Sequence, residues 1–250
     1  DMSKEEFIAE VTDGLLPPPS YFPLNVKMNK EGYDDISDVI ERGTQALDPD
    51  AFEKAANDTG AVILDVRKQA AYAKAHIPRS IFIGIDGGFA PWVDALIADT
   101  KQPILLVAEE GREEETITRL SRVGFDGTIG YLKGGFKSWE SAGKQTDSVH
   151  SVAASALETA VNHNENTPVF DVRKPGEFEA EHLEIAQSTP LDFITDFYIH
   201  CAGGYRSMIA ASILKSRGIH NLIDVQGGYK SLKETDLKTT NFVCPSTLKK

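Results

Sequence analysis

A short stretch of apolar and charged residues occurs twice in this chain. Ile63-Leu64-Asp65-Val66-Arg67-Lys68 returns as Val169-Phe170-Asp171-Val172-Arg173-Lys174. A histidine follows each stretch, His76 in the first copy and His182 in the second. A sequence that repeats in this way predicts two copies of one structural unit.

Short apolar runs alternate with helical patterns around this stretch. In the first copy the runs are Val62-Ile63-Leu64, Ile81-Phe82-Ile83, Ile104-Leu105-Leu106-Val107 and Thr128-Ile129-Gly130-Tyr131. A helical pattern precedes each copy of the repeated stretch, at residues 49–56, with Asp48 or Asp50 as the cap, and at residues 155–161. Continuous apolar runs between helices predict an α/β fold, in which a buried, mostly parallel sheet has helices on both faces.

One loop in the second copy carries a cysteine and an arginine. Cys201-Ala202-Gly203-Gly204-Tyr205-Arg206-Ser207 lies between a strand-like run, Phe197-Tyr198-Ile199, and a segment with helical spacing. A helix amino end offers unpaired N–H groups and partial positive charge, and glycines let such a backbone curl around an anion. The loop is therefore expected to stabilise a Cys201 thiolate as a nucleophile. The alternative is a buried, inert cysteine.

The first copy has no cysteine at the corresponding place. Its loop reads Val107-Ala108-Glu109-Glu110-Gly111-Arg112-Glu113-Glu114-Glu115, and the cysteine position falls on Val107 or Ala108. Five glutamates oppose the binding of an anion. We expect this copy to be inactive and to serve as a scaffold, or as half of a cleft shared with the second copy.

Length, charge and cysteine content limit the function. The 250 residues suggest about two domains. A net charge of −12 argues against nucleic-acid binding and against anionic membranes as partners. The two cysteines, Cys201 and Cys244, form no disulfide framework and fit a reducing cytoplasm, where we expect the protein. Cys244 is interpreted as a tail residue that packs through Phe242 and Val243.

The spacing of the cysteine loop resembles that of rhodanese sulfurtransferases. Four residues separate Cys201 from Arg206, whereas cysteine-dependent phosphatases have five. The repeated Asp-Val-Arg, the histidine after it and the closing glycine pairs, Gly134-Gly135 and Gly227-Gly228, also resemble this family. The resemblance implies two rhodanese-like domains in tandem, at residues 46–146 and 147–250.

The resemblance also implies a function and a set of site residues. Cys201 would take a sulfur atom from thiosulfate or a small persulfide and pass it to a thiol or another thiophile. Arg206 would hold the loop end and attract the donor. The loop residues are Ala202, Gly203, Gly204, Tyr205 and Ser207, and the supporting residues are Asp171, Arg173, Glu177 and His182. No cofactor or metal is expected in this chain.

The comparison of the two copies assigns roles to the supporting residues. Asp171, Arg173 and His182 have counterparts in the inactive copy, which favours structural roles. Glu177 has Ala71 as its counterpart and is expected to pair with Arg173. His200, which precedes the cysteine, is not expected to act as a base.

Other functions stay open at this point. A persulfide carrier that presents sulfur to a partner domain would need the same cysteine. A cysteine phosphatase or arsenate reductase is disfavoured by the loop length. A homo-oligomer is compatible with the sequence.

Residues 1–45 do not have the pattern of a domain. The proline-rich segment 14–23 predicts extended backbone, and Ile36, Val39 and Ile40 predict one short helix. The segment resembles the end of metallo-β-lactamase-fold hydrolases, similar to persulfide dioxygenases, that carry rhodanese domains behind them. This implies that the chain is the carboxyl-terminal part of such a fusion, whose metal ion would lie in the preceding domain. The alternative is that residues 1–45 are a linker or a natural extension that packs on the two domains. The second copy is also shorter before its loop, and we expect residues to be missing between Thr195 and Asp196.

Overall fold

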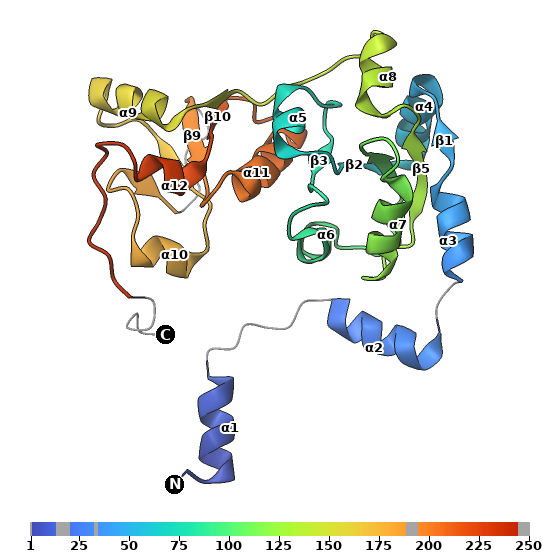
Figure 1. The fold of residues 1–250 in the computed structure, drawn as a ribbon, viewed down its shortest axis with the longest axis horizontal. Helices are drawn as coiled ribbons and strands as arrows, with labels where there is room; N and C mark the ends of the chain where they lie inside the picture. The colour runs from blue at the N-terminus through green and yellow to red at the C-terminus, as the bar shows by residue number, and fades with distance from the viewer. Residues whose placement is uncertain (1, 14–20, 33–34, 189–194, 245–250) are drawn as a thin grey trace.

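The molecule consists of two α/β lobes that lie side by side, and the first two helices of the chain lie below them in Figure 1. The computed structural model describes residues 2–13, 21–32, 35–188 and 195–244. The connection between the lobes runs from the end of α8 (Gly135–Ser141) to β6 (Ser151–Val152).

Lobe one contains a five-stranded sheet and the helices around it. Its elements are β1 (Ala46–Leu47), α4 (Pro49–Thr59), β2 (Val62–Asp65), α5 (Gln69–Lys74), β3 (Ile81–Phe82), α6 (Phe89–Leu96), β4 (Ile104–Val107), α7 (Glu113–Ser121), β5 (Thr128–Leu132) and α8. The predicted strands and helices of this copy are confirmed. The cap of α4 is Asp48, whose carboxylate accepts the N–H of Ala51 at 2.9 Å.

Lobe two repeats this arrangement. Its elements are β6, α9 (Ala154–His163), β7 (Val169–Asp171), α10 (Pro175–Ala180), β8 (Ala186–Gln187), β9 (Phe197–His200), α11 (Tyr205–Ser216), β10 (Leu222–Val225) and α12 (Gly228–Leu232). Residues 189–194, where this copy is shorter, lie outside the described residues. The gap expected between Thr195 and Asp196 stays a prediction.

The two sheets have the same strand order. Lobe one has the order β1-β5-β4-β2-β3 and lobe two has β6-β10-β9-β7-β8. All strand pairs within the described sheets are parallel, as predicted. The central strand is β4 in one lobe and β9 in the other, so the loops that follow these two strands occupy equivalent places at the carboxyl ends of the sheets.

Among the described residues of the first 45 there are three helices, α1 (Lys4–Thr12), α2 (Tyr21–Glu31) and α3 (Ile36–Gly43). Helix α3 is the predicted short helix, and its Val39 is buried in the core of lobe one. The prediction of extended backbone is wrong for residues 21–23, which begin α2, while residues 14–20 lie outside the described residues. Pro23 is tolerated there because the first turn of a helix has no use for its missing N–H group.

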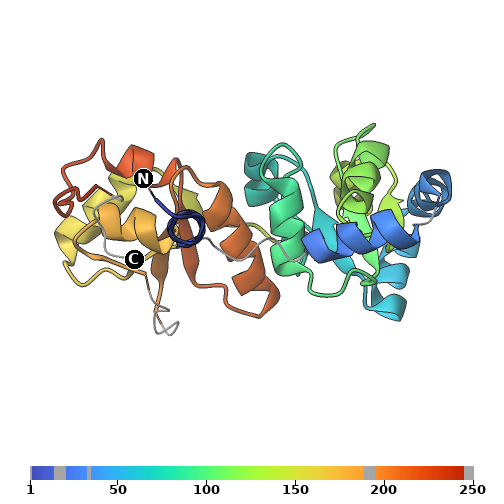
Figure 2. The same cartoon turned by 90° about the horizontal axis from the view of Figure 1, so that it is seen from below.

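Helix α11 lies at the junction of the lobes (Figures 1 and 2). One apolar cluster joins its Met208 and Ile209 to Tyr72 and Phe82 of lobe one. The hydroxyl of Ser212 accepts the N–H of Phe82 at 3.1 Å. A helix that is covered on several sides has buried residues all round, and α11 fits this description. The helix that follows the cysteine loop is therefore supported by lobe one.

Candidate active site

The cysteine loop leaves the central strand of lobe two and enters α11. Cys201 directly follows β9, and Gly204 is the residue that caps the amino end of α11. Gly204 has φ +101°, which lies in the left-handed region that side chains with a Cβ rarely adopt. The turn predicted from the glycines is therefore formed, and it brings the cysteine to a helix amino end.

The sulfur of Cys201 accepts a hydrogen bond from the loop backbone. The N–H group of Gly204 lies 3.1 Å from Cys201 Sγ. The positive end of the α11 dipole is at the same place, so this environment favours negative charge on sulfur. Cys201 is 1% exposed, whereas Gly203 on the rim of the loop is exposed and has open space around it. The sulfur is therefore covered, while the rim of the loop faces solvent.

Backbone from α12 holds the other side of the loop. The carbonyl of Cys201 accepts the N–H of Tyr229 at 2.7 Å, and the carbonyl of Ala202 accepts the N–H of Lys230 at 3.1 Å. Gly228 makes this approach possible, since a Cβ there would lie 2.3 Å from the Cys201 carbonyl oxygen. The repeated glycine pair thus has a physical purpose, which is to bring the start of a helix against the loop.

Arg206 is held by Glu177 in a bidentate ion pair. The distances from the guanidinium nitrogens to the carboxylate oxygens are 2.5 and 2.9 Å. Arg206 lowers the pKa of Glu177. Glu177 in turn raises the pKa of Arg206, and the Cys201 side chain adds to this increase. The predicted Arg173–Glu177 pair is wrong, because Glu177 reaches across to the end of the cysteine loop instead.

Asp171 and Arg173 form a pair with each other beneath the loop. Arg173 Nη2 lies 2.7 Å from the Asp171 carboxylate and donates to the carbonyl of Glu181. In lobe one Arg67 makes the same contacts with Asp65 and Ala75. Each arginine also lies over the aromatic ring that follows the glycine pair of its lobe. Arg67 is 4.2 Å from the ring centre of Phe136, and Arg173 is 3.8 Å from that of Tyr229. This agrees with the expected structural role of the pair.

Three histidines near the site have backbone partners. His182 Nδ1 lies 2.7 Å from the carbonyl of Phe178, and His76 Nδ1 lies 2.9 Å from that of Tyr72. His200 is fully buried, with Nδ1 3.3 Å from the carbonyl of Cys201, and burial lowers its pKa. Burial favours the neutral form of His200, and the expectation that it does not act as a base stays a prediction.

Two residues of the loop point away from the sulfur. The hydroxyl of Tyr205 donates to the carbonyl of Gly84 in lobe one at 2.8 Å, beside a hollow of about 200 Å³ at the junction. The hydroxyl of Ser207 lies 2.7 Å from the carboxyl group of Asp224. Asp224 was missed in the sequence, although a lone carboxyl group in the apolar run Leu222-Ile223-Asp224-Val225 was a usable signal.

The corresponding loop of lobe one contains a carboxylate that accepts a hydrogen bond from the loop backbone. Strand register aligns Val107 with His200, since each pairs with the aspartate of the repeated stretch, so Ala108 occupies the cysteine position. Gly111 then corresponds to Gly204 and also has positive φ, +86°. Its N–H donates to the carboxylate of Glu113 at 2.8 Å.

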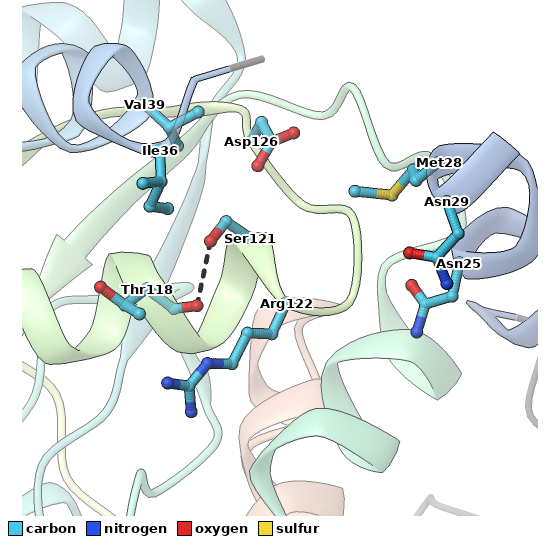
Figure 3. Close-up of a pocket in the computed structure, with 9 residues that line it drawn as sticks. All are labelled: Asn25, Met28, Asn29, Ile36, Val39, Thr118, Ser121, Arg122 and Asp126. Atoms are coloured by element: carbon cyan, nitrogen blue, oxygen red, sulfur yellow. Dashed lines mark hydrogen bonds between the residues drawn. The ribbon is translucent and has the colours of Figure 1, made fainter. Parts of the chain in front are cut away.

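Other features of the molecule lie apart from this site. A hollow of about 440 Å³ is formed where residues of α2, α3 and the end of α7 meet, with Arg122 among them (Figure 3). Cys244 is exposed, and so are Phe242 and Val243, so the expected packing of the tail through these two side chains is wrong. The backbone holds the tail instead, with the N–H of Val243 2.8 Å from the carbonyl of Ala180.

In residues 2–13, 21–32, 35–188 and 195–244, no helix is both long and apolar enough to cross a membrane. Within the same ranges, no three side chains of the His, Cys, Asp and Glu types gather closely enough to hold a metal ion.

Comparison with known proteins points to one family. Residues 48–142 match the model of the rhodanese-like domain. A curated relative, the uncharacterized protein YqhL of Bacillus subtilis (strain 168), is 33% identical over 72 residues, which are 25% of this chain and 57% of the relative. The chain thus spans little more than half the length of that relative.

Solved structures with some similarity include two sulfurtransferases. One is a thiosulfate sulfurtransferase from Pseudomonas aeruginosa, with 17% identity, a TM-score of 0.37, and coverage of 79% of this chain and 44% of that one. The other is the 3-mercaptopyruvate sulfotransferase SseA from Escherichia coli, with 13% identity, a TM-score of 0.35, and coverage of 74% of this chain and 99% of that one. TM-scores this low do not establish a shared arrangement of the two lobes. The match over residues 48–142 supports a rhodanese-like domain in the lobe without the cysteine.

Proposed function

We propose that this chain is a sulfurtransferase that carries sulfur on Cys201. The observation that supports this most is the bond from the Gly204 N–H group to the Cys201 sulfur, at the amino end of α11. A thiolate and a persulfide anion are both stabilised by such a donor. The rhodanese-like domain in lobe one supports the same class of activity.

The reaction would proceed in two covalent steps. The Cys201 thiolate attacks the outer sulfur of thiosulfate or of a small persulfide. A new S–S bond forms, the S–S bond of the donor breaks, and sulfite or a thiolate leaves with the electron pair. A thiophile then attacks the outer sulfur of the Cys201 persulfide, which releases Cys201 as a thiolate again.

The residues around Cys201 would have separate tasks in these steps. The N–H of Gly204 holds the charged sulfur, and the contacts from Tyr229 and Lys230 keep the loop in shape. Arg206, fixed by Glu177, adds positive charge beside the sulfur. Ala202 and Gly203 form the rim through which the donor passes.

Lobe one would act as a support and not as a second catalyst. It contacts α11 near its start through Tyr205, in its middle through Ser212 and near its end, where Lys215 Nζ lies 3.1 Å from Asp147 of the connection between the lobes. The N–H of Gly111, just before its own helix α7, is occupied by the Glu113 carboxylate. We also propose that the lobes are tandem rhodanese-like domains and that the protein works in cytoplasmic persulfide metabolism, joined to a metal-containing oxygenase domain.

Intact mass spectrometry tests this function. After incubation with thiosulfate, the chain should gain one sulfur atom, Cys201→Ser should gain none, and Cys244→Ser should gain one. Cyanide should then remove the sulfur as thiocyanate, with turnover. Loading without turnover would indicate a carrier, and sulfur on the Cys201→Ser variant would overturn the assignment.

A further inference from the structure

A buried carboxyl group lies under the cysteine loop and has no part in the reaction described above. Asp224, the third residue of β10, is 1% exposed. Its Oδ1 lies 2.7 Å from the Ser207 hydroxyl and its Oδ2 lies 3.3 Å from the Ser151 hydroxyl. No lysine, arginine or histidine of the described chain lies within ion-pair distance of it. A buried carboxylate without a cation is costly, and burial raises the pKa of Asp224.

The contacts of Ser207 require a count of protons. Its hydroxyl oxygen lies 2.9 Å from the carbonyl of Gly204 and 2.7 Å from Asp224 Oδ1. A hydroxyl has one proton and can donate to only one of these two acceptors. If Ser207 donates to Gly204, the contact with Asp224 needs a proton on the carboxyl group. Both bonds are satisfied together only when Asp224 is protonated.

The contacts from Asp224 through Ser207 lead to Gly204, whose N–H group donates to the Cys201 sulfur. Gly204 presents its carbonyl to Ser207 and its N–H to Cys201. A charged Asp224 would turn the Ser207 proton toward itself and would place a second negative charge at the helix start that stabilises the thiolate. Like charges at one site disfavour each other. Lobe one has Tyr131 at the place of Asp224, so this carboxyl group belongs to the lobe with the cysteine.

Few of the groups that face Asp224 are titratable or charged, so few of them can change its protonation state. Strand β6 presents the Ser151 hydroxyl and α11 presents the Ser207 hydroxyl. Strand β9 places Ile199 alongside Asp224, and its end carries the titratable groups of His200 and Cys201. His200 is directed to the Cys201 carbonyl and lies 3.9 Å from Asp171.

We propose that Asp224 is a positioning residue for Cys201: its protonated carboxyl group donates to Ser207, which in turn holds Gly204 so that the Gly204 N–H stays on the sulfur. This rests on the proposed role of Cys201 as the reactive thiol. Loss of the Asp224 proton makes the thiolate harder to form.

The test compares Asp224→Asn with the parent chain, both with Cys244→Ser so that one thiol remains. An asparagine amide donates to Ser207 at every pH, whereas the carboxyl group does so only when protonated. The rate of Cys201 alkylation by iodoacetamide is measured against pH. We expect the parent to show an additional titration step that Asp224→Asn lacks. Ser207→Ala should also lack this step, because the connection to Gly204 is removed. Asp236→Asn, at an exposed aspartate of the same lobe, should keep it.

Thermal unfolding gives a second measurement that does not depend on the reactivity of the thiol. The folded state holds the Asp224 proton more tightly than the unfolded state, so the parent loses stability as pH rises above the usual aspartate value of about 4. The difference in Tm between Asp224→Asn and the parent should grow with pH, to about 2–4 °C. A Tm difference independent of pH, or identical alkylation profiles, would overturn the proposal. Failure of sulfur loading with these differences intact would overturn only the sulfurtransferase function.

Discussion

The loops after β4 and β9 place a glycine with positive φ at the same point and give its N–H group to different anions. In lobe two the N–H of Gly204 donates to the Cys201 sulfur, and in lobe one the N–H of Gly111 donates to the Glu113 carboxylate. In the same alignment Glu113 stands where lobe two has Arg206. The features that both lobes share, such as the Asp–Arg pair and the glycine pair, build the fold. The lobes differ in the anion that this N–H group meets, a cysteine sulfur in lobe two and a carboxylate in lobe one.

The strongest challenge to this comparison is to move the cysteine from one lobe to the other. We expect Ala108→Cys, combined with Cys201→Ser, to leave sulfur transfer at least about 10³-fold below the parent chain. Glu113 occupies the N–H donor, and the neighbouring glutamates repel an anionic donor. The measurement is the rate of thiocyanate formation from thiosulfate and cyanide.

A third substitution serves as the control for this experiment. Adding Glu113→Ala releases the N–H group of Gly111, so the thiol introduced by Ala108→Cys should be alkylated several-fold faster than with Glu113 in place. Sulfur transfer by the double variant with Glu113 intact would show that the carboxylate does not decide the difference between the loops.

Substitutions in the two glycine pairs are expected to have the next largest effect. The lobes differ in how closely the second glycine of the pair approaches the loop after the central strand. A Cβ on Gly228 would lie 2.3 Å from the Cys201 carbonyl oxygen, and one on Gly135 would lie 3.1 Å from that of Ala108. Both glycines have positive φ, which alone costs about 1 kcal/mol for alanine. Gly228→Ala should lower the free energy of unfolding by about 2–4 kcal/mol, and Gly135→Ala by about 1 kcal/mol.

Urea unfolding of the two glycine variants tests this ranking. Sulfur transfer should fall with Gly228→Ala, since the Cys201 loop has to shift, and should change little with Gly135→Ala. Equal losses of stability would mean that the contact between the glycine and the loop has the same tightness in both lobes.

The ion pair of Glu177 is absent from lobe one, where Ala71 stands in its place. Glu177→Gln keeps the shape of the side chain but removes the charge that holds Arg206, so we expect sulfur transfer to fall several-fold. Stability should change by at most about 1 kcal/mol, since both side chains are partly exposed. Glu179→Gln on the same helix is the matched control.

The pH dependence of the Glu177 pair has a defined sign. Arg206 lowers the pKa of Glu177. The stabilisation by the pair is therefore present above the usual glutamate value of about 4.3 and is lost as pH falls through the lower, folded value. The difference in stability between the parent and Glu177→Gln should shrink on acidification below about pH 4. A difference that persists at lower pH would contradict the ion pair.

Much of the fold could be predicted because the sequence contains two copies of one unit, and each copy could be compared with the other. Apolar runs located four of the five strands of lobe one, and Asp65 and Asp171 fixed the alignment of the lobes. The pairing of Glu177 was mispredicted because a sequence shows which charges exist but not which element brings them together. Arg206 comes from α11 and Glu177 from α10, and only the packing of these helices joins them.

The sequence also contained no signal for the junction of the lobes. Helix α11 is buried on several sides, which removes the one-sided apolar stripe that would show which face meets a sheet. Phe82 and Tyr205 each follow the patterns of their own lobe, yet their rings lie edge to face at 5.8 Å across the junction. Contacts of this kind depend on how two complete units dock, which local patterns do not specify.

The smallest predicted effect concerns the hydrogen bond that links the cysteine loop to lobe one. Tyr205→Phe removes the hydroxyl that donates to Gly84 but keeps the ring on Phe82, and we expect a loss of about 1 kcal/mol in the free energy of unfolding. Burial raises the pKa of Tyr205 to about 12, so the hydroxyl keeps its proton and the bond persists through neutral and moderately alkaline pH. Tyr198→Phe, on β9, is the matched control.

The course of unfolding decides whether this bond belongs to one shared core. Because an apolar cluster joins α11 to β3 and α5, a weakened junction should lower the urea midpoint of both lobes together. Trp92 and Trp139 lie in lobe one, so their fluorescence can be compared with circular dichroism of the whole chain. Coincident transitions that shift together in Tyr205→Phe support a shared core. Tryptophan fluorescence that stays unchanged while circular dichroism shifts would show that lobe two unfolds alone, and lobe one could then not act as the support for α11.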